Sequence, residues 1–150
     1  MSGMLDDPNV LRELIMDHYQ YPRNHQLVKD DKAYSAVHMA SESCIDDIEV
    51  QAKINNDKIE DVRFDGVACT ISTASTSMMT ELLIGKSIAE AKEIMNHYFS
   101  MIDEKPYDEE ILQEAIAMKG VSKQASRIKC ATIGWNAMAQ LLNEGGNKDE

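Results

Sequence analysis

Long apolar runs are absent from this chain of 150 residues, and its first residues do not have the pattern of an export leader. No stretch approaches the roughly 18 to 20 apolar residues that a membrane-spanning helix needs. The first ten residues, MSGMLDDPNV, lack the basic start and the apolar core of a secretion signal. We therefore expect a cytoplasmic protein without a membrane partner.

Positive charge is also scarce. Fifteen Lys and Arg residues stand against 26 Asp and Glu residues, so the formal net charge is −11. A chain this acidic repels a phosphate backbone, and nucleic acid is therefore not an expected partner. The length and the 43% of hydrophobic residues fit a single domain over residues 1–150 with one core.

Cysteine is rare: the chain has only Cys44, Cys69 and Cys130, and no two of them form a CxxC motif. An odd number of cysteines in a chain without an export signal argues against a disulfide framework. Thiol chemistry, metal binding and plain burial remain as explanations. The four histidines show no paired ligand spacing, so we expect them to be structural or solvated.

Hydrophobic periodicity predicts an α+β fold. Residues 8–20 have helical spacing, and residues 46–64 alternate around a polar turn, which predicts a β-hairpin with a bulge between Ile59 and Val62. A further strand is expected near residues 35–40. Helical patterns then follow at residues 70–84, 87–98, 108–118 and 131–142. Strands followed by helices indicate a small antiparallel sheet with helices packed on one face.

All three cysteines fall at boundaries between these predicted elements. Cys44 precedes the hairpin, Cys69 precedes a helix, and Cys130 opens the last helix after a basic turn that holds Arg127 and Lys129. A helix N-terminus presents unpaired N–H groups and a partial positive charge, which stabilise a thiolate. Thiolates bind metals and attack sulfur. The alternative is that three small side chains fill junctions beneath the sheet, and position alone does not separate the two.

An aspartate near the first cysteine favours the metal interpretation. Asp46 follows Cys44 by two residues, where a loop can turn both side chains toward one centre. Three thiolates and one carboxylate form a tetrahedral ligand set that suits zinc. The neighbouring Asp47 is a competing source of the carboxylate, and only geometry can exclude it.

Four segments carry a family resemblance that extends over nearly the whole chain: DHYQYPRNHQL (17–27), CIDDI (44–48), GVACTISTASTSMMTELLIGKS (66–87) and SRIKCATIGWNAM (126–138). With these segments the chain resembles the U-type iron–sulfur cluster assembly proteins, related to IscU and to the N-terminal part of NifU, and most closely their SufU branch. Two features favour SufU. Residues 101–120 look like the insertion of that branch, and Lys129 stands where scaffold-type members have a histidine ligand.

The resemblance implies an IscU/SufU-like fold and a zinc ion held by Cys44, Asp46, Cys69 and Cys130. It also implies a zinc-dependent sulfurtransferase in which Cys44 accepts persulfide sulfur from a SufS-type cysteine desulfurase. In the family, a histidine of the desulfurase replaces this cysteine on zinc and frees it to attack the persulfide. Downstream iron–sulfur assembly proteins would receive the sulfur, and Arg127 is expected to steer it.

Two other functions fit the same cysteines. A scaffold would assemble a transient Fe–S cluster on the three thiolates and transfer it. A structural zinc domain would use the metal only to fold. The loop before the hairpin also departs from the family pattern, since Ser41 and Glu42 stand where Asn-Pro is usual and Ile45 replaces a glycine. A β-branched residue is stiffer than glycine, so we expect a less mobile loop and slower transfer, and Ile45 offers an apolar contact to a partner.

Overall fold

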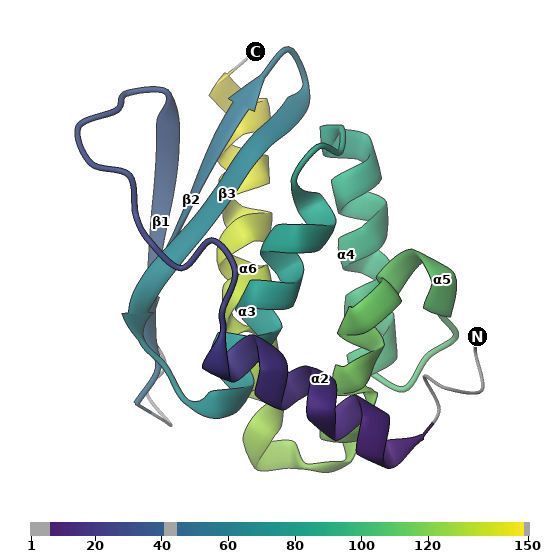
Figure 1. Ribbon diagram of the computed structural model, residues 1–150. Helices are drawn as coiled ribbons and strands as arrows, with labels where there is room; N and C mark the ends of the chain where they lie inside the picture. Colours follow the sequence, from purple (N-terminus) through teal and green to yellow (C-terminus); the bar gives the residue numbers. More distant parts are fainter. Residues whose placement is uncertain (1–6, 41–44, 149–150) are drawn as a thin grey trace.

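The computed structural model describes residues 7–40 and 45–148, with side chains through residue 143. Its elements, in chain order, are α2 (Pro8–Gln20), β1 (Tyr34–Ala40), β2 (Asp47–Asn55), β3 (Lys58–Val67), α3 (Thr70–Leu83), α4 (Ile88–Ile102), α5 (Glu109–Leu112), the 3-10 helix η1 (Gln113–Lys123) and α6 (Ala125–Lys148). The sheet lies to one side of the helices (Figure 1). The predicted α+β fold is confirmed.

The sheet is antiparallel with the order β1-β2-β3. Val37, Val50 and Phe64 pair across it and are all buried. The β2–β3 hairpin turns at Asn56 and Asp57, which both have positive φ, as a tight two-residue turn requires. Pairing shifts between Lys53 and Ile54 because β3 has an extra residue at Glu60. This is the bulge that the sequence predicts between Ile59 and Val62.

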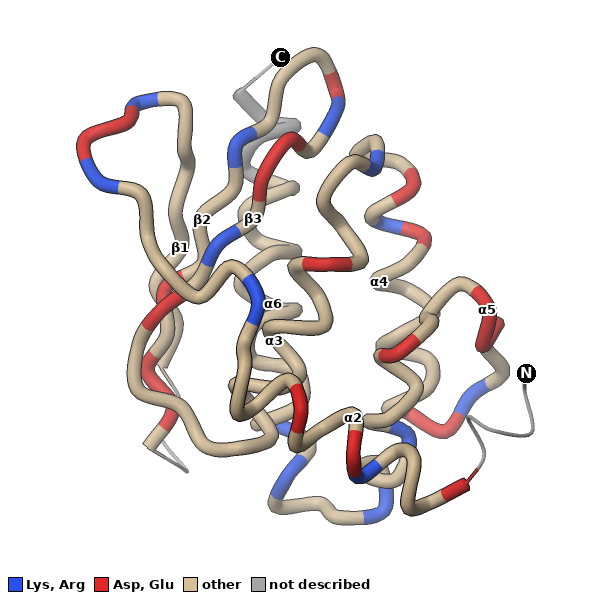
Figure 2. Tube along the Cα trace, in the orientation of Figure 1, with Lys and Arg blue, Asp and Glu red and all other residues tan. Residues whose placement is uncertain are grey.

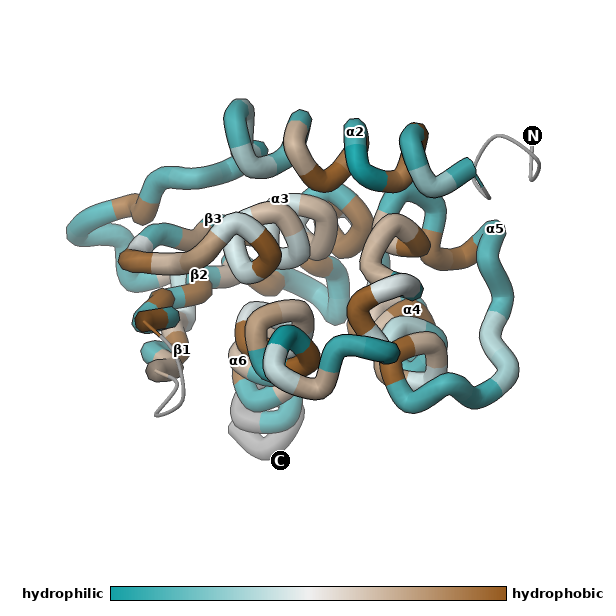
Figure 3. Tube along the Cα trace, turned by 90° about the horizontal axis from the view of Figure 1, so that it is seen from below, coloured by the Kyte–Doolittle hydropathy of each residue, from teal (hydrophilic) through white to brown (hydrophobic). Residues whose placement is uncertain are grey.

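Helix α3 occupies the centre of the molecule, with α2 on one side and α6 on the other (Figure 3). Its small hydroxyl side chains are buried, which lets neighbouring helices approach closely. The clearest case is Gly134 on α6, where an added Cβ would lie 2.2 Å from Oγ1 of Thr76. The short side chains of α3 therefore serve close helix packing, as the sequence suggests.

Three predicted helix ranges differ from the structure: α4 continues to Ile102, α6 extends beyond 131–142 at both ends, and residues 108–118 are not one helix. Helix α6 begins at Ala125, so Arg127 and Cys130 lie in its first two turns and Cys130 does not open the helix. Most side chains of residues 125–129 are exposed, and a helix turn without a buried face leaves little hydrophobic signal.

The region predicted as one helix over residues 108–118 is interrupted. The chain breaks at Gln113, which has a φ of 49°, and continues as a 3-10 helix. Buried Leu112, Ala115, Met118 and Val121 recur every three residues, which is the period of a 3-10 helix, and Ile116 and Ala117 between them are buried as well.

A buried polar network joins α3, α4 and α6. The indole N–H of Trp135 donates to Oγ of Ser75 at 3.0 Å, and the hydroxyls of Ser75 and Tyr98 each donate to the carbonyl of Ala131 at 2.6 Å. The rings of Tyr98 and Trp135 stack with centroids 3.7 Å apart. Burial raises the pKa of Tyr98, so its hydroxyl stays a donor.

Within the described residues, no helix is long and apolar enough to span a membrane.

Replacing Ser75 tests how much this hydrogen-bond network contributes to the stability of the fold. Ser75→Ala leaves the buried Trp135 N–H without its acceptor, and we expect the free energy of unfolding to fall by about 1–3 kcal/mol. Urea unfolding followed by the fluorescence of Trp135, the only tryptophan, measures the loss. Ser126→Ala, at an exposed position of α6, is the matched control and should change stability little. Equal stability of the two variants would contradict the assignment.

Candidate functional site

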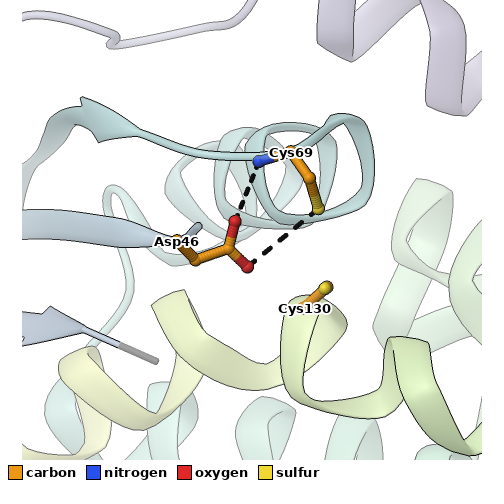
Figure 4. Close-up of side chains that lie close together, drawn as sticks. All are labelled: Asp46, Cys69 and Cys130. Atoms are coloured by element: carbon orange, nitrogen blue, oxygen red, sulfur yellow. Dashed lines mark hydrogen bonds between the residues drawn. The ribbon is translucent and has the colours of Figure 1, made fainter. Parts of the chain in front are cut away.

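Three potential ligand residues meet where β2, α3 and α6 come together. Asp46 directly precedes β2, Cys69 directly precedes α3, and Cys130 lies in the second turn of α6. One ligand atom from each lies within 4.8 Å of the other two. Figure 4 shows the three side chains directed toward a common point. Residues far apart in the sequence thus form one site.

The carboxylate of Asp46 is held firmly inside the protein. Only 1% of the residue is exposed. Its Oδ1 accepts a hydrogen bond from the backbone N–H of Cys69 at 2.8 Å, and its Oδ2 accepts one from the hydroxyl of Ser72. A carboxylate loses its hydration when it is buried, and such donors compensate for that loss. Asp46 is therefore oriented before any ligand arrives.

Cys69 is the N-cap of α3, as its predicted place before a helix requires. Its Sγ accepts a hydrogen bond from the backbone N–H of Ser72 at 3.5 Å and lies 3.4 Å from Oγ of the same residue. This sulfur replaces the Ser, Thr or Asp oxygen that usually caps a helix. The sulfur therefore lies at the positive end of the α3 dipole.

A glycine allows the sheet to close beside the site. Gly66, near the end of β3, has a φ of +134° and pairs with Ile48. An added Cβ there would lie 2.2 Å from the backbone oxygen of Asp47. Only glycine permits this approach of β3 to the start of β2, and the chain reaches Cys69 three residues later.

The geometry decides between the two neighbouring aspartates. Asp47 turns to the exposed side of the sheet, where its carboxylate contacts Nε2 of His38. Asp46 points inward to Cys69 and Cys130. Successive residues along an extended chain face opposite sides, so only one of the pair can reach the cysteines. Asp46 is that residue.

Of the remaining predicted site residues, some lie near this cluster and others fall outside the residues that the structure describes. Cys44, Ser41 and Glu42 fall outside the described residues. Ile45 is 68% exposed, which agrees with its expected role as an apolar surface contact. Arg127 is exposed on α6, three residues before Cys130. Figure 2 shows basic segments gathered where η1 runs into α6.

Sequence reasoning missed Ser72, which contacts both Asp46 and Cys69. The available signal is the spacing: a residue three positions after an N-cap is where the cap makes its hydrogen bond. Among several Ser and Thr residues in α3, that offset singles out Ser72.

The donors at this site suit a divalent metal ion. Two thiols and a carboxylate would place several negative charges within a few ångströms in a largely buried position once the thiols ionise. Such charges require a nearby cation. Sulfur and carboxylate oxygen are both established ligands of zinc.

The fold and this cluster define an α+β protein with a thiol-rich candidate metal centre. A family model described as the NifU-like N terminal domain matches residues 11–131. The chain therefore belongs to this family, which includes IscU.

Three relatives are similar to this chain over most of its length. The zinc-dependent sulfurtransferase SufU of Bacillus subtilis (strain 168) is 41% identical over 98% of this chain and 100% of its own length. The iron–sulfur cluster assembly scaffold protein IscU of Streptococcus pyogenes serotype M1 is 39% identical over 89% of this chain and 83% of its own. The crystal structure of FiSufU from Fervidobacterium islandicum AW-1, described as an iron–sulfur cluster assembly scaffold protein for the SUF system, matches with a TM-score of 0.79 and 32% identity, covering 87% of this chain and 94% of that one.

The role of Ser72 can be measured without any metal. In metal-free protein, Ser72→Ala removes a hydroxyl donor from the buried Asp46 carboxylate, and we expect the free energy of unfolding to fall by about 2 kcal/mol. Urea unfolding of the variant and of Ser35→Ala, a change at an exposed strand position, gives the comparison. If Ser72→Ala were as stable as the control, Ser72 would not be supporting Asp46.

Proposed function

We propose that this protein is a zinc-dependent sulfurtransferase that accepts persulfide sulfur from a SufS-type cysteine desulfurase for iron–sulfur cluster assembly in the cytoplasm. The convergence of Asp46, Cys69 and Cys130 carries the proposal. The near-full-length similarity to a SufU protein supports it.

Cys44, Asp46, Cys69 and Cys130 would hold the zinc ion. When bound, zinc supplies the positive charge that keeps cysteine ligands as thiolates near neutral pH. The fold holds the three described ligand residues in place. Asp46 and Cys69 are fixed by hydrogen bonds to each other and to Ser72, and Cys130 is fixed within a helix. They form a fixed set of ligands, and Cys44 precedes Asp46 by two positions in the sequence.

The transfer itself requires one nucleophile, which we assign to Cys44. Its thiolate attacks the outer sulfur of the desulfurase persulfide, and a new S–S bond forms on Cys44. The S–S bond within the persulfide breaks, and the desulfurase cysteine leaves as a thiolate. The same exchange in the opposite sense, with an acceptor thiolate, unloads the sulfur onto a downstream assembly protein. No external oxidant or reductant is needed.

Two exposed apolar side chains mark the edge that would meet the desulfurase. Ile45 is adjacent to Asp46, and Val67, which is 61% exposed, pairs with Asp47. Apolar side chains at the centre of an interface bury well and exclude water. The exposed Arg127, on the α6 side of the site, would add a charge that attracts the anionic persulfide.

A scaffold is the second candidate, favoured by the similarity to the streptococcal protein named as an IscU scaffold. The same residues could then hold a nascent Fe–S cluster. Anaerobic reconstitution followed by transfer to an acceptor protein separates the two functions. A sulfurtransferase retains zinc and holds only labile cluster, whereas a scaffold builds and delivers a cluster.

Cysteine-dependent sulfide release tests the proposed function. Zinc-loaded protein should raise the turnover of a SufS-type desulfurase severalfold, and zinc-stripped protein should not. Cys44→Ser should return turnover to the basal rate, because the acceptor sulfur is missing. Alkylation and mass spectrometry of the wild type should locate the persulfide on Cys44. Full stimulation by Cys44→Ser, or no stimulation by folded zinc-loaded protein, would refute the proposal.

Arg127 should influence transfer through its charge. We expect Arg127→Ala to lower kcat/KM for sulfur transfer about tenfold, equivalent to about 1.4 kcal/mol, with a loss that shrinks as salt increases. Arg127→Lys keeps the charge and should recover most of the rate. Lys123→Ala removes a nearby exposed charge and serves as the control. Equal effects of the two alanine variants would indicate only a general attraction to this surface.

A further inference from the structure

A second group of potential metal ligands lies away from the cysteines. His18 on α2, Glu81 on α3 and Glu114 on η1 each place one ligand atom within 4.8 Å of the other two. These residues line a cavity of about 260 Å³. Cys69 caps α3 and Glu81 lies twelve residues later, so the Cα atoms of these two residues are about 18 Å apart along the helix axis. The second cluster is therefore a site of its own.

The imidazole of His18 is buried and held in one orientation. The residue is 1% exposed, and its Nδ1 lies 2.8 Å from Oγ of Ser77. Its Nε2 faces the carboxylates: it forms a hydrogen bond with Oε1 of Glu114 at 2.8 Å, which a bound ion would replace, and lies 3.8 Å from Oε1 of Glu81. Histidine ligands of metals are typically oriented in this way, by a hydrogen bond at the ring nitrogen that does not bind the ion.

The distances between the donors bracket those expected around a metal ion. Two donors about 2.1 Å from an ion lie roughly 3.0 to 3.4 Å apart at the octahedral or tetrahedral angle. The distances from Nε2 to the two carboxylates lie on either side of this range. The glutamate side chains are 49% and 53% exposed, so they can adjust without disturbing the core.

The local charge also calls for a cation. Two carboxylates face each other across the cavity, and the nearby cation Arg23 is engaged elsewhere, with Nη2 2.6 Å from Asp17 and only a 3.7 Å approach to Glu81. Burial disfavours the charged guanidinium, but Asp17 and the two glutamates together raise the pKa of Arg23. Arg23 therefore stays charged, yet the cluster keeps an excess of negative charge.

We propose that His18, Glu81 and Glu114 bind a divalent first-row transition metal ion through Nε2 and two carboxylates. Imidazole nitrogen and carboxylate oxygen suit such ions without the sulfur that distinguishes the cysteine cluster. The cavity leaves room on the ion for water or a small anionic ligand. The proposal does not depend on sulfur transfer.

Manganese binding to zinc-loaded protein tests this site. Mn²⁺ binds N and O donors and stands lowest in the Irving–Williams order, so it leaves zinc at the thiolates in place. We expect one Mn²⁺ to bind per chain, measured by loss of the free-ion EPR signal, with nitrogen hyperfine coupling from an imidazole. Glu81→Gln and Glu114→Gln should each weaken binding at least about tenfold.

Glu93→Gln, an exposed carboxylate change on α4, is the control and should leave the affinity unchanged. His18→Asn should abolish the nitrogen coupling; because substitution of a buried residue threatens the fold, the wild-type coupling and the two glutamine variants carry the test. Absence of Mn²⁺ binding, binding without nitrogen coupling, or equal loss in all three glutamine variants would overturn the proposal. Desulfurase stimulation is measured separately, so the two proposals can fail independently.

Discussion

The structure depends on the need to satisfy buried hydroxyl groups along α3. A buried hydroxyl without a partner costs free energy comparable to a lost hydrogen bond, so each bonded one constrains what packs beside it; Oγ1 of Thr76, packed against Gly134, is the exception and has no hydrogen-bond partner. The hydroxyls of α3 reach different parts of the molecule: Ser72 to Asp46, Ser75 to Trp135 and Ala131, Ser77 to His18 and Arg23, and Thr80 to Asn24. The central helix thereby sets the positions of α2, α6 and the start of β2.

Both candidate sites lie at ends of this network. At the N-terminus of α3, Ser72 orients a carboxylate beside the capping sulfur of Cys69. Toward its C-terminus, Ser77 orients the ring of His18, and Glu81 follows one turn later. In both places a serine that packs in the core also fixes a potential ligand. Helix packing and site geometry therefore arise from the same short polar side chains, and neither can change alone.

Much of this was predictable, and the failures have physical causes. The periodicity of the strands and of α2 shows in the sequence because each buries one face. The start of α6 was missed because its first turn is mostly exposed, and the single helix over residues 108–118 was wrong because a buried period of three also fits a 3-10 helix. The sequence placed Cys69 before a helix correctly. The sequence did not decide whether Asp46 or Asp47 supplies the carboxylate, because only the structure at the start of β2 shows which of the two side chains faces inward. The His18 cluster combines three elements, and no local pattern reports it.

The two clusters differ in a way that would sort metal ions. The first offers sulfur in a largely buried position, and the second offers nitrogen and oxygen beside an open cavity. Thiolates favour soft or borderline ions, whereas imidazole and carboxylate also accept harder ones. Since α3 separates the clusters, neither set of ligands can complete the coordination of an ion in the other. A protein built this way could keep a zinc ion at its thiolates while a second metal exchanges with solvent at His18, because the chemistry of the donors distinguishes the ions.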